Sequence, residues 1–163
     1  MTKMTKPSLK DPEIVFLTFF GSGLSPWAPG TMGSLAILVP LYILGQLNPP
    51  FFLFLPFITI LCVGSLYMIN RVEKKMGLHD PQWIVIDEVV GMWIATLFLQ
   101  NNSLTHFLMA FIWFRVFDIF KPWPINYFDN MNNSFGTLFD DVVAGLLAGG
   151  LYLLTLHAAA LLQ

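Results

Sequence analysis

Five acidic side chains lie within apolar segments of this sequence or at the ends of those segments. They are Asp87, Glu88, Asp118, Asp140 and Asp141. A carboxylate that faces lipid at the bilayer centre costs about 3 kcal/mol on insertion scales, so we expect all five to face one shared polar cavity. The adjacent pair Asp87 and Glu88 has no cation near it in the sequence, which makes a purely structural role hardest to assign to this pair.

Two cations accompany these carboxylates. Arg115 and Asp118 are three residues apart and share a helix face, and Lys121 follows one turn later. Because five carboxylates exceed two cations, a hard divalent ion with oxygen ligands, such as Mg²⁺, would relieve their repulsion. The two cations and the Gly-, Pro- and Ser-rich loop at residues 21–30 suit a phosphate group. The pattern indicates Mg²⁺-assisted phosphoryl transfer or hydrolysis.

Some of these acidic residues also fit plain structural roles. Asp80 precedes a proline, which is typical of a helix N-cap followed by the first helical residue. Thr137 and Asp140 fit a capping box at the start of a helix. Arg115 and Asp118 fit an ordinary ion pair within one helix.

The composition indicates that a bilayer surrounds the elements that hold this cluster. Of 163 residues, 56% are hydrophobic and 11% are charged, whereas a soluble domain carries about 25% charged residues. We expect an all-α, polytopic integral membrane protein with a polar tail at residues 1–13 and one membrane-embedded catalytic domain at residues 14–163. A net charge of −2 without a basic stripe excludes nucleic acid as a partner.

About five apolar helices are predicted to form a bundle around the cavity. They cover residues 31–47, 51–69, 84–100, 104–120 and 142–162, with long polar loops at residues 71–83 and 121–139. Crossing the hydrocarbon takes roughly 20 residues, so the shorter segments imply local thinning or partial insertion. Gly145 and Gly149 form a GxxxG pattern, which favours close packing between helices.

The charged residues indicate the orientation of this bundle. All 18 Asp, Glu, Lys and Arg residues fall within residues 3–13, 71–88 and 115–141. Five helices with a cytoplasmic N-terminus place every one of them on the same side, and the positive-inside rule makes that side the cytoplasm. We therefore expect a cytosol-facing cavity.

Four stretches of the sequence form a recognisable set. They are GSGLSPWAPGTMGSL (21–35), DPQWIVIDEVVGMW (80–93), FRVFDIFKPWPI (114–125) and GTLFDDVVAGLLAG (136–149). Together they resemble the phosphatidylglycerophosphatase A family of bacterial lipid phosphatases. The resemblance implies a Mg²⁺-dependent enzyme of the bacterial inner (cytoplasmic) membrane. Its substrate would be a phospholipid of the bilayer, phosphatidylglycerophosphate, hydrolysed to phosphatidylglycerol and phosphate.

The motif positions of that family suggest roles for individual residues, which we state as hypotheses. The predicted Mg²⁺ ligands are Asp87, Glu88, Asp118 and Asp141. The predicted substrate-binding residues are Ser25, Thr31, Arg115 and Lys121. The predicted catalytic residues are Asp87, Glu88, Asp118, Arg115 and Lys121, with Arg115 and Lys121 offsetting charge in the transition state. Water is the expected nucleophile, with one carboxylate as base.

Two other function classes compete with this prediction. A phosphotransferase acting on CDP-linked lipids also needs aspartates and a divalent metal, but its DG…AR…G…D…D spacing is missing from the sequence. A transporter or ion relay also uses buried carboxylates, but a relay should have polar groups on the far side, where this chain carries no charge. Metal count, catalytic base, oligomeric state and protein partners stay open.

Overall fold

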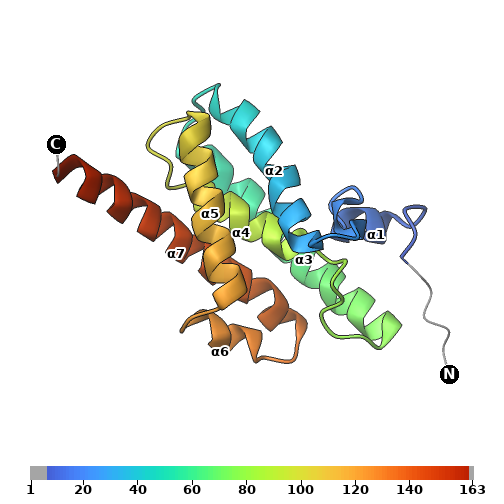
Figure 1. Ribbon diagram of the computed structural model, residues 1–163. Helices are drawn as coiled ribbons and strands as arrows, with labels where there is room; N and C mark the ends of the chain where they lie inside the picture. The colour runs from blue at the N-terminus through green and yellow to red at the C-terminus, as the bar shows by residue number, and fades with distance from the viewer. Residues whose placement is uncertain (1–6, 162–163) are drawn as a thin grey trace.

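The computed structural model describes residues 7–161, and over these residues it contains helices and no strand (Figure 1). The helices are α1 (Pro12–Leu17), α2 (Pro29–Gly45), α3 (Phe54–Met76), α4 (Ile86–Thr96), α5 (Leu104–Phe120), α6 (Ile125–Asp129) and α7 (Ser134–Leu161), with 3₁₀ turns η1 (Ser22–Leu24) and η2 (Phe51–Leu53). The all-α prediction is confirmed. Residues 1–6 of the predicted polar tail and the last residue of the predicted fifth helix lie outside the described residues.

Within residues 7–161, two helices, α3 and α7, are long and apolar enough to cross a membrane. The shorter α2 is also apolar, and α5 matches the predicted bounds of its segment. The C-terminal half of α7 projects from the rest of the bundle (Figure 1), and Leu154 and Leu161 are exposed there. Five membrane-crossing helices remain a prediction, since length and composition single out two.

α4 is a short central helix that protein surrounds on most sides. It packs against α2, α3, α5 and α7, and most of its side chains are buried. Its 11 residues rise about 16 Å at 1.5 Å per residue. Because neighbouring helices surround α4, its ends need not reach the two lipid–water boundaries. This position makes α4 the scaffold on which the first turn presents Asp87 and Glu88.

The polar loop predicted at residues 71–83 is helical over its first part. α3 continues through Glu73 and ends at Gly77, whose φ of +64° and N–H bond to the Glu73 carbonyl cap the helix. Arg71 pairs with Glu13 in the first turn of α1 at 2.7 Å, so a charged residue after the apolar segment holds α3 against α1. The loop prediction was wrong here because a run of charged residues can continue a helix above its apolar part.

The last helix also begins earlier than predicted, at Ser134 rather than at residue 142. Asn133 Oδ1 accepts a hydrogen bond from the N–H of Gly136 at 2.9 Å, which is the contact of an N-cap. The capping box predicted at Thr137 is therefore wrong, because Thr137 lies inside the helix.

α6 lies within the predicted loop at residues 121–139, and its first residue, Ile125, is buried.

Candidate active site

A pocket of about 480 Å³ lies where the N-terminal ends of α2, α4 and α7 meet the C-terminal end of α5. Its charged lining residues are Asp80, Asp87, Glu88, Asp118, Asp140, Asp141, Arg115 and Lys121. Six acidic groups against two basic groups give the pocket a formal excess of negative charge. Every predicted metal ligand and both predicted phosphate-binding cations line this one pocket.

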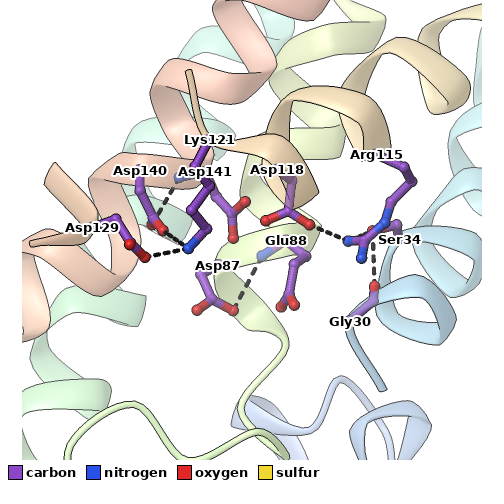
Figure 2. A network of polar contacts seen from close by, with 10 residues as sticks. All are labelled: Gly30, Ser34, Asp87, Glu88, Arg115, Asp118, Lys121, Asp129, Asp140 and Asp141. Atoms are coloured by element: carbon purple, nitrogen blue, oxygen red, sulfur yellow. Dashed lines mark hydrogen bonds and ion pairs between the residues drawn. The ribbon is translucent and has the colours of Figure 1, made fainter. Parts of the chain in front are cut away.

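Asp87, Glu88 and Asp141 form a carboxylate triad within the pocket (Figure 2). One carboxylate oxygen from each residue lies within 4.8 Å of the other two. Oε2 of Glu88 and Oδ1 of Asp141 are buried and have no hydrogen-bond partner among the described residues. Buried polar atoms without partners are costly, and three oxygen donors at this spacing suit Mg²⁺. The residues present therefore fit the predicted metal.

Local backbone contacts orient the acidic pairs on α4 and α7 in the same way. The N–H of Glu88 donates to Asp87 Oδ1 at 3.1 Å, and the N–H of Asp141 donates to Asp140 Oδ1 at 2.9 Å. In each pair one oxygen of the first carboxylate is thus bound by the backbone. The first turn of α4 also places Asp87 and Glu88 at the positive end of the helix dipole, which favours negative charge.

Asp118 lines the pocket but lies outside the triad, and it is paired with Arg115. Arg115 Nη1 lies 2.5 Å from Asp118 Oδ2, so the ion pair expected within this helix is present. Arg115 Nη1 also donates to Ser34 Oγ at 3.4 Å, and that hydroxyl donates to the carbonyl of Gly30 at 2.9 Å. Figure 2 shows this chain of contacts linking α5 to the first turns of α2. Arg115 Nε is buried without a partner in the described part of the chain, which leaves a donor for an anion.

Lys121 is held at the other side of the pocket. It follows α5 with a φ of +42°, and its Nζ contacts Asp129 and lies 2.7 Å from Asp140 Oδ2. Burial alone lowers the pKa of Lys121, but its hydrogen bonds to Asp129 and Asp140 outweigh this and raise the pKa overall. The side chain is therefore a fixed positive charge.

Asp80 lies at the pocket wall and does not cap a helix. No helix begins at the following residue, since α4 starts at Ile86, so the N-cap prediction was wrong. The N–H of Asp80 donates to Glu73 Oε1 at 2.9 Å, and its φ is +45°. Burial raises the pKa of the Asp80 carboxyl, although the charge of Lys121 opposes the rise.

The sequence of this chain is similar to those of known proteins over most of its length. The sequence model of the family described as phosphatidylglycerophosphatase A matches residues 15–156. The chain belongs to the phosphatidylglycerophosphatase A family. It is 40% identical to the phosphatidylglycerophosphatase A of Escherichia coli (strain K12), over 88% of this chain and 83% of that protein.

Two further relatives extend this family likeness. The phosphatidylglycerophosphatase A of Haemophilus influenzae is 40% identical over 89% of both chains. A Bacteroides thetaiotaomicron protein named putative phosphatidylinositol-3-phosphatase is 34% identical, over 88% of this chain and 91% of its own length. No solved structure matches the chain.

Two predicted substrate-binding residues of this phosphatidylglycerophosphatase A family member lie beside the pocket rather than in its wall. The pocket lining includes Pro26, Gly30 and neighbouring loop residues, but not Ser25 or Thr31. Ser25 Oγ donates to the carbonyl of Trp27 at 2.9 Å and accepts from its N–H at 3.2 Å. Ser25 thereby shapes the turn before α2, and contact of either residue with substrate stays a prediction.

Sequence reasoning did not assign roles to two contributors to the site, Gly30 and Ser34. A Cβ at Gly30 would collide with the carboxylate of Glu88, so a side chain at this position would displace that carboxylate from its place in the triad. Ser34 supplies the hydroxyl that Arg115 contacts. Both lie in the 21–35 stretch of the family motif, four residues apart on one helix face. That spacing was the signal available in the sequence.

Proposed function

We propose that this chain is a Mg²⁺-dependent phosphatase that hydrolyses phosphatidylglycerophosphate to phosphatidylglycerol and phosphate. Membership of the phosphatidylglycerophosphatase A family and the two relatives of that name support this activity. The observation that carries the chemistry is the carboxylate triad, whose buried oxygens on Glu88 and Asp141 lack partners among the described residues, beside the Arg115 guanidinium.

The reaction replaces the bond between phosphorus and the glycerol oxygen with a bond to a water oxygen, and the departing glycerol oxygen takes up a proton. Asp87, Glu88 and Asp141 would hold Mg²⁺. Asp118 lines the same pocket and could supply a further oxygen ligand. When bound, the ion would supply positive charge against the phosphate oxygens and promote ionisation of water at neutral pH.

The remaining pocket residues bind and orient the phosphate group. Arg115 presents a guanidinium to the phosphate and neutralises charge that develops in the transition state. Asp118 and Ser34 both contact Nη1 of that guanidinium, so little reorganisation is needed when the phosphate enters. Lys121 adds a second positive charge at the opposite wall. One pocket carboxylate takes the proton of the attacking water.

We also propose that the protein is a multi-pass protein of the bacterial inner membrane with the pocket facing the cytoplasm. The apolar lengths of α3 and α7 support membrane insertion. The concentration of Lys and Arg toward the pocket end supports its cytoplasmic orientation.

A transporter remains the alternative from another class of function. The absence of charged residues from the turns at 46–50 and 100–103 argues against a path for ions across the bilayer.

The deciding experiment measures phosphate release by the purified full chain in detergent micelles containing phosphatidylglycerophosphate. We expect release with Mg²⁺ and its loss when EDTA removes the ion. Asp87→Asn and Asp141→Asn should each lower kcat about 100-fold or more, because each removes a charged ligand from the triad. Asp11→Asn, on the surface before α1, is the matched control and should keep full activity.

Substrate choice is tested in the same assay with phosphatidic acid and phosphatidylinositol 3-phosphate, the latter suggested by the name of the Bacteroides relative. We expect phosphatidylglycerophosphate to give the highest kcat/KM. Absence of phosphate release from it at any Mg²⁺ concentration, by protein that is folded, would refute the proposed activity. Ion flux into sealed vesicles without phosphatase activity would favour the transporter.

A further inference from the structure

α4 and α7 are in direct backbone contact just below the carboxylate triad, at Gly91 and Gly145. A Cβ at Gly145 would collide with the carbonyl oxygen of Gly91. A Cβ at Gly91 would lie 2.5 Å from the carbonyl oxygen of Asp141 and 2.6 Å from the ring of Phe114. Backbone atoms cannot rotate away as a side chain can. These two positions therefore accept only glycine at the present helix separation.

The register of this contact matches the register of the acidic residues. Gly91 lies four residues after Asp87 on α4, and Gly145 lies four residues after Asp141 on α7. Residues four apart lie one above the other on a helix. Each glycine thus lies one turn below a member of the triad, and this backbone contact between the two helices lies directly beneath the site.

We propose that Gly91 and Gly145 are positioning residues for the divalent cation, because their contact sets the separation between the acidic pair on α4 and Asp141 on α7. This inference rests on the proposed Mg²⁺ site. Without the contact, the backbones separate and the triad widens. Mg²⁺ needs oxygen atoms at about 2.0–2.1 Å in near-octahedral geometry, whereas Ca²⁺ accepts about 2.3–2.6 Å and looser geometry. A wider triad would therefore lose affinity for Mg²⁺ more than for Ca²⁺.

Two other glycines of α7 provide matched controls. A Cβ at Gly149, one turn further along the same interface, would meet the ring of Phe98, so its replacement disturbs packing farther from the triad. A Cβ at Gly150 would meet nothing within 4 Å. Gly149→Ala therefore tests helix packing in general, and Gly150→Ala tests the change of residue type alone.

The experiment follows ion binding through thermal unfolding of the full chain in detergent, with Mg²⁺ or Ca²⁺ titrated into each variant. Ligands that bind the folded state raise Tm. We expect Gly145→Ala to raise the Mg²⁺ concentration for half of the Tm shift about tenfold or more, with a smaller change for Ca²⁺. Gly149→Ala and Gly150→Ala should keep the wild-type midpoint, even where Gly149→Ala lowers Tm in the absence of ions.

The outcomes separate this inference from the proposed site. If Mg²⁺ does not shift the Tm of the wild-type protein, the metal site itself is refuted. If the wild type responds and folded Gly145→Ala responds at the same Mg²⁺ concentration, the positioning role is refuted. It is also refuted if Gly149→Ala weakens Mg²⁺ binding equally, because general packing then explains the effect.

A second variant covers the case in which Gly145→Ala gives no folded protein. Gly91→Ala is then measured in a Phe114→Leu background, which removes the aromatic ring from the contact, with Phe114→Leu alone as the reference. The same increase in the Mg²⁺ midpoint is expected. An unchanged midpoint overturns the proposal.

Discussion

The two cations of the pocket are held in different ways, and this difference separates their contributions. Arg115 is fixed by Asp118 and Ser34 yet keeps a buried Nε without a partner among the described residues. Lys121 contacts two carboxylates, those of Asp129 and Asp140. Arg115 therefore has donor capacity left for a phosphate, whereas binding a phosphate at Lys121 competes with two existing contacts.

Arg115→Lys should show how much the guanidinium shape matters. A lysine keeps the charge but cannot contact Asp118 and Ser34 and also offer the planar pair of donors that matches a phosphate. We expect kcat/KM for phosphatidylglycerophosphate to fall about tenfold or more. The measurement is steady-state phosphate release at saturating Mg²⁺.

Arg71→Lys is the matched control for this substitution, because Arg71 makes an exposed ion pair with Glu13 away from the pocket. Its activity should equal that of the wild type. Equal activity of Arg115→Lys and Arg71→Lys would contradict the role assigned to the Arg115 guanidinium.

The sequence allowed us to predict that the carboxylates converge on one pocket. It did not allow us to predict which side chains each of them contacts. Asp87 and Glu88 stood out because no cation lies near them in an apolar segment, and they do lie within the triad. The grouping of Asp118 with the metal ligands was less informative, since an ion pair with Arg115 was a structural alternative and is present in the fold. The contact of Asp129 with Lys121 had no signal, because it depends on how the chain folds back through α6.

At the scale of elements, apolar content was enough to predict that a helix exists. Where a helix begins and ends depended on contacts with other parts of the fold. The bounds of α5 were predicted correctly at both ends. The first turns of α7 were missed because the polar residues Thr137, Asp140 and Asp141 are buried there against neighbouring helices. Hydropathy averages cannot distinguish a polar face that lines a pocket from a loop.

A polar contact also joins α5, α7 and the turn after α4 at the end of the bundle away from the pocket. The buried Tyr152 of α7 accepts a hydrogen bond from the N–H of Gln100 at 3.1 Å, and its hydroxyl lies 2.6 Å from His106 Nδ1 on α5. One hydroxyl thereby joins the turn after α4, the start of α5 and the middle of α7.

Tyr152→Phe should weaken this junction without touching the chemistry. The ring still fills its site, but the part-buried Gln100 N–H and an imidazole nitrogen lose their partner, and a hydrogen bond typically contributes about 0.5–1.5 kcal/mol. We expect the free energy of unfolding in detergent to fall by that amount, with kcat unchanged for the folded fraction.

Tyr67→Phe provides the comparison, because Tyr67 is 62% exposed on α3 and its loss of a hydroxyl should change stability by less than about 0.5 kcal/mol. Equal stability of Tyr152→Phe and Tyr67→Phe would show that the buried junction contributes nothing measurable. A large loss of kcat in folded Tyr152→Phe would show that the far end couples to the pocket.

For the whole molecule, the two ends of the bundle differ in charge and in hydrogen bonding. The pocket end gathers the charged residues of α4, α5 and α7. At the other end, Gln46 Nε2 donates to the carbonyl of Asn102 at 2.6 Å, and Asn102 Nδ2 donates to Asn48 Oδ1 at 2.7 Å. Neutral amides thus join the two turns of the far end, which suits the side of a membrane that lacks the positive-inside signal.

This polarity leads to a test of orientation with single cysteines. Cys62, in α3, is the natural cysteine and is first replaced by Cys62→Ser. Ser103→Cys then places a thiol at the far turn, and Asn132→Cys places one between α6 and α7; both positions are exposed. In intact bacterial cells, a membrane-impermeant maleimide should label Ser103→Cys, whereas Asn132→Cys should react only after the cells are opened.

The physical basis of this expectation is that Lys and Arg side chains such as Arg115 and Lys121 of the pocket resist transfer across the inner membrane, while the uncharged turns cross readily. Phosphatase activity of each variant verifies that the labelled protein is folded. Labelling of Asn132→Cys in intact cells, with Ser103→Cys protected, would reverse the proposed topology. The pocket would then open away from the cytoplasm, and a substrate phosphate in the cytoplasmic leaflet could not reach Arg115 and the carboxylate triad.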